Sequence, residues 1–525
     1  MNTIVALLIA PVLGLLTTAF LPSSVANANV GRLRVATTTL VAAQLLLACI
    51  LALAYLASAG APLAFSVFED LHDAPLGFSV YYDGASALML TLVSFVGLVV
   101  SRFSVRYLDG EALQGRYFRW LGFTIGAVSL MVIAGNLLLF FAAWVMTSFG
   151  LHQLLLHYRR RESAHRAAWT KFAISRLGDV FLVSALVLTF RSFGTLELSA
   201  LFDSVGQAGA TQSAAVQAAI GWLLMLGAAT KSAQFPFHTW LPDTMETPTP
   251  VSALMHAGIV NAGGYLMIRM SPLVASAPAA LTTLALVGGF TACFAGVVMM
   301  TQPSVKRALA YSTIAQMGFM MLQCGLGAYS AAMLHIIAHS LYKAHAFLSS
   351  GSVVADSLAT GGARSLTPGI ARSAACFVAA GAAVAVAYLT VAETAGVHAS
   401  SKPGGLVLAF LLCLALTTWG WRVLACGGAR AATGGLAALS LLCLTYIGGY
   451  LVVQHFIARS SVAPLIQPGM AAAPLAIAGA FVALLALHVA VVARFRPQWL
   501  EAARVHAANG FYVDALFQRV FAAAR

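Results

Sequence analysis

The sequence predicts an all-α polytopic membrane protein with about fifteen transmembrane helices. Hydrophobic residues make up 60% of the chain and charged residues 9%, and the mean hydropathy is +0.89. Soluble globular domains, in contrast, contain about 25% charged residues. Apolar runs of roughly 18 or more residues, long enough to cross a bilayer as a helix, recur along the whole chain. Basic residues gather in every second loop between these runs, which is typical of membrane proteins.

The apolar runs place the transmembrane helices along the chain. In order, we predict them at 3–21, 34–58, 84–101, 116–135, 136–157, 168–190, 213–231, 250–270, 281–301, 307–326, 329–356, 371–391, 405–425, 431–455 and 473–493. No Gly-rich nucleotide loop and no CxxC pair interrupts them, so the chain shows no motif for a cofactor or a metal of its own.

The charge pattern predicts an orientation. Most of the 29 Lys and Arg residues, Lys171 among them, are assigned to the odd-numbered loops and the C-terminal tail. The opposite loops contain Arg191, Arg269, Lys402 and Arg459, and the loop 61–83 is acidic. By the positive-inside rule, the N-terminus is then periplasmic and the C-terminus cytoplasmic in a bacterial inner membrane. The net charge of +13 is therefore an orientation signal and does not indicate nucleic-acid binding.

Two further lysines, Lys231 and Lys343, fall inside predicted helices. A charge at the bilayer centre costs at least about 2.5–3.5 kcal/mol on insertion scales, so both indicate function. Lys231 ends a helix shortly before Pro236, where a break predicts a polar pocket. The negative helix end favours an ammonium group and burial favours a neutral amine, so this lysine is placed to switch its protonation state. The alternative is a side chain that extends to the membrane interface.

The helix 329–356 contains a second polar group. His335, His339 and Lys343 are spaced by four residues and therefore share one face. A buried line of groups that titrate near neutral pH indicates a proton relay. Two alternatives remain open: histidines that bond neighbouring helices, or a metal pair, which needs a third ligand.

Other titratable residues are candidate partners of Lys231. His256 lies on the next helix and is the candidate next station of the relay, and His238 lies within the broken stretch. Asp179, in the sequence "RLGD", pairs with Lys231 or Arg176, or else caps its helix; these alternatives stay open.

Four motifs identify a family resemblance. They are "KSAQFPFHTWLPDTMETPTPVSALMHA" (231–257), "VKRALAYSTIAQMGF" (305–319), "HIIAHSLYKAHAFLSSGSV" (335–353) and "NGFYVDALFQRVF" (509–521). They resemble the proton-conducting antiporter-like membrane subunits of respiratory complex I and of multisubunit cation/proton antiporters. The resemblance implies two inverted five-helix repeats, each with a broken helix, and a proton path along Lys231, His256, His335, His339 and Lys343.

The same resemblance divides the chain into four parts. N-terminal helices occupy 1–115, the two repeats 116–270 and 281–425, and C-terminal helices with a short cytoplasmic tail 426–525.

The chain also departs from this family. Val145 stands where the family has the glutamate that pairs with the broken-helix lysine, and His152, two turns later, is the nearest substitute in sequence. The second repeat offers only Glu393, Lys402 and Arg422 where the family has another lysine.

These departures, with the variant "MHAGIVNAGG" (255–264), resemble the membrane subunits of bacterial inorganic-carbon accumulation (DAB) complexes. That resemblance implies H⁺ or Na⁺ flow coupled to one-way CO₂ hydration in a DabA-like partner, a largely soluble zinc subunit on the cytoplasmic side. No zinc is then expected in this chain. A proton-pumping subunit of complex I or of a cation/proton antiporter is the alternative. A quinone-binding redox subunit would require a cofactor motif that the sequence lacks.

Overall fold

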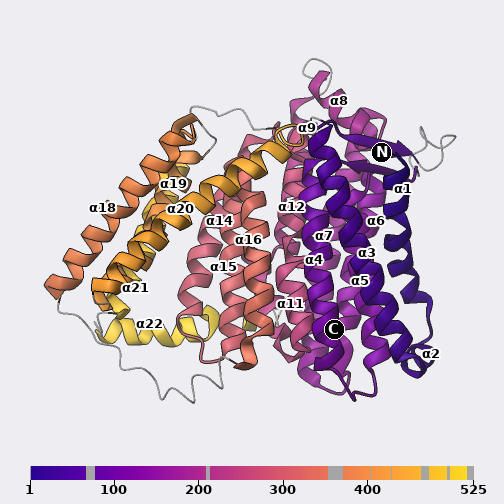
Figure 1. Ribbon diagram of the computed structural model, residues 1–525, viewed down its shortest axis with the longest axis horizontal. Helices are drawn as coiled ribbons and strands as arrows, with labels where there is room; N and C mark the ends of the chain where they lie inside the picture. Colours follow the sequence, from indigo (N-terminus) through magenta and orange to yellow (C-terminus); the bar gives the residue numbers. More distant parts are fainter. Residues whose placement is uncertain are drawn as a thin grey trace.

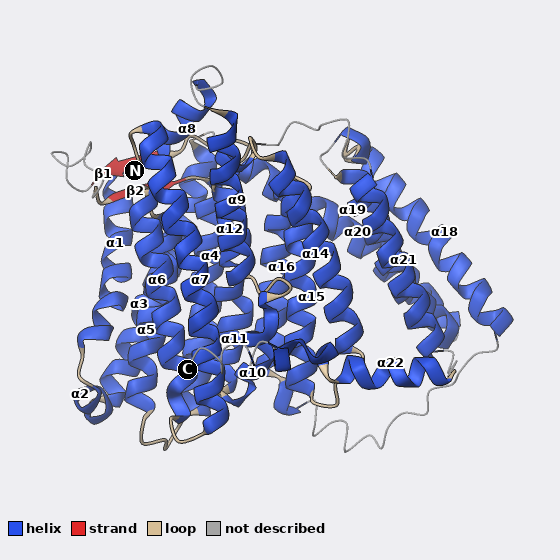
Figure 2. Ribbon diagram, turned by 180° about the vertical axis from the view of Figure 1, so that it is seen from behind, coloured by secondary structure: helices blue, strands red, loops and turns tan. Residues whose placement is uncertain are grey.

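The fold is a bundle of long helices that run between two faces of the molecule (Figures 1 and 2). The computed structural model describes residues 2–58, 60–66, 77–207, 213–352, 370–401, 404–426, 429–462, 472–492, 497–516 and 519. Within these residues, eleven helices are long and apolar enough to cross a membrane. Within the described residues, every predicted transmembrane run overlaps helical structure, which confirms the polytopic helical class. The number fifteen and the inverted repeats remain predictions.

The helices of the first part of the chain form the larger body in Figure 1. They are α1 (Asn2–Thr17), α2 (Ser23–Ala28), α3 (Val30–Ala57), α4 (Gly84–Tyr107), α5 (Gln114–Ile133), α6 (Leu137–Leu155), α7 (Glu162–Phe193), α8 (Leu198–Gln207), α9 (Ala214–Lys231), α10 (Trp240–Asp243), α11 (Thr249–Ala257), α12 (Ala262–Arg269) and α13 (Ser271–Val274). The later helices are α14 (Pro278–Met299), α15 (Val305–Gly325), α16 (Tyr329–Leu348), α18 (Ile370–Thr394), α19 (Gly405–Cys426), α20 (Ala429–Ile457), α21 (Ala472–Val492) and α22 (Gln498–Ala508).

A short hairpin is the exception to the all-helical prediction. The strands β1 (Leu63–Ser66) and β2 (Ser79–Tyr82) pair antiparallel, with Leu63 opposite Tyr82. The aromatic and β-branched sequence of β2 favours a strand. The hairpin lies at the same end of the bundle as α8 (Figure 2). The acidic residues predicted in this loop at Glu69, Asp70 and Asp73 lie outside the described residues.

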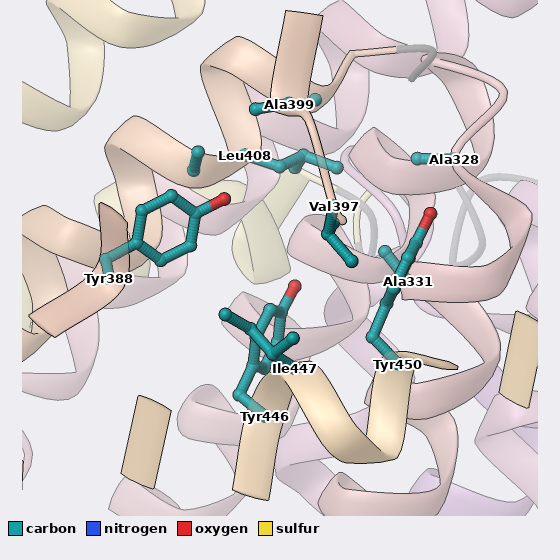
Figure 3. Close-up of a pocket in the computed structure, with 11 residues that line it drawn as sticks. Ala328, Ala331, Tyr388, Val397, Ala399, Leu408, Tyr446, Ile447 and Tyr450 are labelled. Atoms are coloured by element: carbon teal, nitrogen blue, oxygen red, sulfur yellow. The ribbon is translucent and has the colours of Figure 1, made fainter. Parts of the chain in front are cut away.

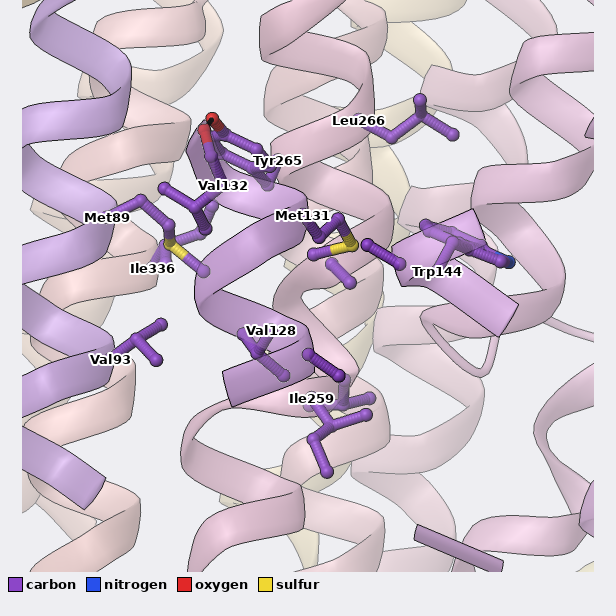
Figure 4. Close-up of a cluster of buried hydrophobic side chains, with 14 of the residues drawn as sticks. Met89, Val93, Val128, Met131, Val132, Trp144, Ile259, Tyr265, Leu266 and Ile336 are labelled. Carbon is purple, nitrogen blue, oxygen red and sulfur yellow. Dashed lines mark hydrogen bonds between the residues drawn. The ribbon is translucent and has the colours of Figure 1, made fainter. Parts of the chain in front are cut away.

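The core lies between α4, α5, α6, α12 and α16. Figure 4 shows Met89, Val128, Trp144 and Tyr265 converging there from four of these helices, together with Ile336 from α16. Side chains in such a core are close-packed and hold their neighbours in fixed positions. Trp144 is 1% exposed, which fixes the part of α6 that faces the break after α9.

Two of the C-terminal helices bury few of their residues. The buried share of the most apolar stretch is 94% in Thr249–Arg269, whereas it is 11% in α18 and 6% in α21. Figure 1 shows α18 to α21 at one side of the molecule, with α20 leaning across towards the body. The Tyr55 hydroxyl donates to the Phe456 carbonyl at 3.2 Å, which ties the end of α20 to α3.

A broken helix is found in the first predicted repeat but not in the described residues of the second. There, α14, α15, α16, α18 and α19 each run without interruption. The first repeat instead contains a further interruption, because the 3-10 turn Ile259–Asn261 separates α11 from α12. Gly258, just before this turn, has φ −122° and ψ −72°, outside the helical range. The prediction of a second-repeat break therefore has no counterpart in the part of the chain described.

Candidate functional site

The break predicted after α9 is present. α9 ends at Lys231, and only short turns and the four-residue helix α10 occupy the chain until α11 begins at Thr249. Pro236 and Pro242 lack the backbone N–H that a continuous helix requires. Ala233 has a φ of 49°, in the left-handed region that a non-glycine residue rarely adopts. The irregular backbone is buried inside the protein, which is where membrane proteins tolerate it.

Lys231 is held by neutral acceptors on α6. Its Nζ donates to the Ser148 hydroxyl at 2.7 Å, the Thr147 hydroxyl at 2.9 Å and the Trp144 carbonyl at 3.3 Å. The nitrogen also lies 4.5 Å from the centre of the Trp144 ring, within reach of a cation–π interaction. The side chain is 6% exposed. The hydroxyl groups of Thr147 and Ser148, two and three residues after Val145, thus accept hydrogen bonds from the lysine. At Val145 itself, the family has a carboxylate.

Asp179 lies on α7, which packs closely on α9 one residue before Lys231. A Cβ atom at Gly178 would lie 2.2 Å from the Thr230 hydroxyl, so only glycine allows this approach. Asp179 is 8% exposed, and its Oδ2 lies 2.7 Å from Arg176 Nη2. The structure therefore pairs Asp179 with Arg176, and among the described residues it forms no ion pair with Lys231.

His152 and His238 lie near the break without bonding to Lys231 among the described contacts. The Nδ1 atom of His152 is 3.2 Å from the Ala168 carbonyl of α7. His238 is 1% exposed, with its ring stacked on Phe235 and edge-on to Phe294. The sequence-based substitute for the missing glutamate, His152, is therefore not the group that contacts the lysine.

The predicted line on α16 is present. Lys343 is fully buried, and its Nζ donates to the Leu309 carbonyl of α15 at 3.1 Å. His339 is 5% exposed, and its ring centre lies 5.9 Å from that of His335. The Nδ1 atom of His335 is 3.0 Å from the Gln323 side-chain oxygen. The side chains of His335, His339 and Lys343 share one face of α16, and His335 and Lys343 contact α15 from this face.

His256 of α11 contacts α16, and together with His335, His339 and Lys343 it forms what is called the α16 group. Its ring stacks on Phe347 of α16 at 4.4 Å and is fully buried, and it interacts electrostatically with Lys343 and His339. Among the described residues, no hydrogen bond or ion pair joins His256 to Lys231. The five predicted path residues therefore form two groups, one at the break and one on α16.

Lys171 is a buried lysine that the loop assignment missed. It is 2% exposed on α7, and its Nζ donates to the Ser148 carbonyl at 2.6 Å. The assignment to a cytoplasmic loop is wrong because α7 begins at Glu162, well before the apolar run. Its position inside the predicted helix 168–190 was the feature of the sequence that indicated a helical residue.

Arg269 is likewise buried and not in an external loop. It is 1% exposed, and its Nη1 lies 2.8 Å from the Asp83 carboxylate. Its second terminal nitrogen donates to the Tyr265 hydroxyl at 2.6 Å and to Ser86. A buried arginine needs such partners, and here they fasten the end of α12 to α4.

The predicted polar residues of the second repeat form no comparable site among the described residues. Glu393 is exposed near the end of α18, and Arg422 contacts His488 of α21 at 2.5 Å. Lys402 lies outside the described residues. Among the described residues, no three His, Cys, Asp or Glu side chains are placed to hold a metal ion, so His335 and His339 gain no third ligand there.

A cavity among the C-terminal helices lies apart from both lysine groups. Figure 3 shows Tyr388 of α18 and Tyr446 and Tyr450 of α20 around it, with Ala328 and Ala331 at the α16 end. Its lining contains none of the predicted path residues.

Comparison with known families defines the class of protein. Residues 134–384 match the family described as NADH:quinone oxidoreductase/Mrp antiporter, TM. Residues 69–118 match the N-terminal part of chain 5 of NADH-ubiquinone oxidoreductase, complex I. The buried lysine at a helix break and the Lys/His face of α16 lie inside the first match. Over these residues the chain is similar to the antiporter-like membrane subunits of these complexes.

Within that family, the chain is similar to inorganic-carbon transporter subunits, as the sequence motifs predicted. It is 49% identical over 278 residues to the probable subunit DabB2 of Halothiobacillus neapolitanus, covering 53% of this chain and 50% of the relative. It is 39% identical over 310 residues to the probable subunit DabB of Hydrogenovibrio crunogenus, covering 56% and 60%. The matches thus span about half the length of these relatives.

A solved structure agrees on the fold. The Mrp complex of Dietzia sp. DQ12-45-1b contains a chain that superposes with a TM-score of 0.64 at 23% identity, covering 99% of this chain and 59% of that one.

Proposed function

We propose that this chain is the ion-conducting membrane subunit of a bacterial inorganic-carbon uptake complex and that it moves protons. One observation carries the proposal: buried lysines and histidines lie in a helix bundle of the antiporter-like family, and their hydrogen-bond partners are largely neutral. Ionisable groups in membrane helices are expensive and mark ion pathways. A Lys/His path with few carboxylates suits H⁺ better than Na⁺, which prefers oxygen ligands.

The imidazoles of the α16 group are available for relay. Among the described residues, neither ring nitrogen of His256 and neither of His339 has a protein partner. A neutral imidazole donates from one nitrogen and accepts at the other, so water between these rings would complete a proton wire. The gap between Lys231 and His256 would be crossed in the same way.

The chemistry on carbon is assigned to a partner. A DabA-like zinc subunit, largely soluble and on the cytoplasmic side, would hydrate CO₂ to bicarbonate in one direction, driven by cation flow through this chain. A zinc-bound water with a lowered pKa supplies the nucleophile in such hydration. The similarity to probable inorganic-carbon transporter subunits supports this proposal.

Growth tests the proposal. Lys231→Ala should abolish growth in ordinary air, and high CO₂ should restore it because only uptake is lost. Lys306→Ala is the matched control, since Lys306 is a partly buried lysine at the start of α15. Growth of the Lys231→Ala strain in air at the normal rate would contradict the proposal.

Orientation is a separate part of the proposal. We place the protein in the bacterial inner membrane with its N-terminus periplasmic, as the charge pattern predicts. A reporter fused after Arg525 should read cytoplasmic, and one inserted near Asp70 should read periplasmic. The reverse reading at either position would overturn the orientation.

A second candidate is a proton-pumping subunit of complex I or of a multisubunit cation/proton antiporter. It is favoured by the family match over residues 134–384. Purification of the tagged chain from its native membrane separates the candidates. A soluble zinc protein should co-purify under the first, and several hydrophobic or iron–sulfur subunits under the second.

A further inference from the structure

Lys171 and Lys231 contact the same residue of α6 from two helices. The Lys171 Nζ donates to the Ser148 carbonyl at 2.6 Å, and the Lys231 Nζ donates to the Ser148 hydroxyl at 2.7 Å. The side chains are 2% and 6% exposed. The two nitrogen atoms are therefore linked through hydrogen bonds to one serine, inside the protein.

Few charges are available to compensate this pair. Asp179 acts on both lysines, but it is already 2.7 Å from Arg176. His152 on α6, which interacts electrostatically with Lys171, adds no negative charge. With both lysines charged, this group of residues would carry two uncompensated positive charges. Like charges at such separation in a buried site strongly disfavour double protonation.

We propose that Lys171 and Lys231 form a pair that holds one exchangeable proton, with Lys171 as the proton partner of Lys231 in place of the family glutamate. The inference rests on the proposed function and names a residue that acts in it. One lysine of the pair is a charged ammonium while the other is a neutral amine. The two lysines can exchange these states, so the total charge of the pair stays at +1. Coupled groups of this kind titrate as a unit.

Ser148 provides the connection. Its hydroxyl accepts a hydrogen bond from the charged lysine and can donate one to the neutral amine. When the Lys171 side chain turns from the Ser148 carbonyl to the hydroxyl, a proton leaves Lys231 for the serine oxygen. The serine proton then passes to the Lys171 amine. No atom or charge is gained or lost.

The test is proton flux in vesicles that contain the purified, reconstituted complex, recorded with an enclosed pH-sensitive dye across the neutral pH range. Lys171→Arg keeps a donor for the Ser148 carbonyl but does not release a proton. We expect it to reduce flux to background although the complex assembles at wild-type levels. Lys171→Met should do the same, and adding Val145→Glu should restore part of the flux with a shifted pH profile. Lys306→Met is the matched lysine control and should behave as wild type.

The outcomes separate this inference from the function on which it rests. If Lys231→Ala abolishes flux while Lys171→Arg keeps the wild-type rate and pH profile, Lys171 only positions α6 and the pair is refuted. Normal flux in Lys231→Ala would refute the proposed function itself. Failure of Val145→Glu to restore any flux, in a complex that assembles normally, would refute the replacement of the glutamate by Lys171.

Discussion

Lys231 and Lys343 are both buried lysines in one bundle, but their surroundings differ. Lys231 stands at a helix end and donates to three oxygen atoms of α6, with Asp179 nearby on α7. Lys343 stands within the continuous helix α16 and donates to a single carbonyl, that of Leu309. Its electrostatic neighbours include His256 and His339.

The difference assigns different tasks to the two lysines. A helix end and hydroxyls together stabilise a positive charge, so the break suits a site where a proton rests. A lysine among imidazoles has few groups that stabilise its charge, and such a site suits passage of a proton. We therefore expect changes at the two places to have distinguishable effects.

A large effect, comparable with the loss expected at Lys231, is expected on α16. Alanine at His335, His339 or Lys343 should lower proton flux by about 100-fold, the usual contribution of a positioned proton-transfer group. The complex should still assemble, because these variants remove no helix. His345→Ala is the control, since this exposed histidine lies on another face of α16. Loss of all three variants from the membrane would show that the histidines serve structure alone.

A smaller effect is expected from separating α7 from α9. Gly178→Val would press a side chain against Thr230, and overpacking of this kind costs about 1–3 kcal/mol. It should lower the thermal unfolding temperature and also flux, because Asp179 moves away from Lys231. Gly448→Val is the control, because no atom lies within 4 Å of a Cβ atom built at Gly448 on α20. Unchanged flux in Gly178→Val would remove Asp179 from the description of the Lys231 site.

The smallest effect concerns a pH response that belongs to neither lysine. Burial, and then the nearby Asp243, raises the pKa of Asp514 to about 6. The unfolded value is about 3.9, so the folded state binds this proton more tightly and the stabilisation is lost as pH rises through about 6. Asp514→Asn should flatten the fall of the unfolding temperature over this interval without changing the pH profile of flux. An unaltered unfolding profile would contradict the burial of this carboxyl group.

The sequence predicted the helices well because their signal is local. Each apolar run is long enough to cross a bilayer, so it identifies a transmembrane helix without knowledge of its neighbours. The proline-rich stretch after Lys231 predicted the break. The spacing on α16 likewise placed His335, His339 and Lys343 on one face.

The contacts between helices could not be predicted in this way. The neutral partners of Lys231, Thr147 and Ser148, are ordinary residues of an apolar helix, and only the packing of α6 against α9 shows their role. Lys171 was assigned to a loop because several charged residues stand just before it in the sequence. They hide the fact that α7 already begins at Glu162. Arg269 was assigned to an external loop because Asp83, the partner that allows its burial, is distant in sequence.

The most direct test of proton release at the break is Lys231→Arg, measured as proton flux in vesicles near neutral pH. Arginine can donate to the same α6 oxygens but does not give up its proton. We predict that the complex assembles and that flux falls to background, as in Lys231→Ala. Wild-type flux in Lys231→Arg would show that a permanent positive charge is sufficient, and Lys231 would then not be a proton-switching residue.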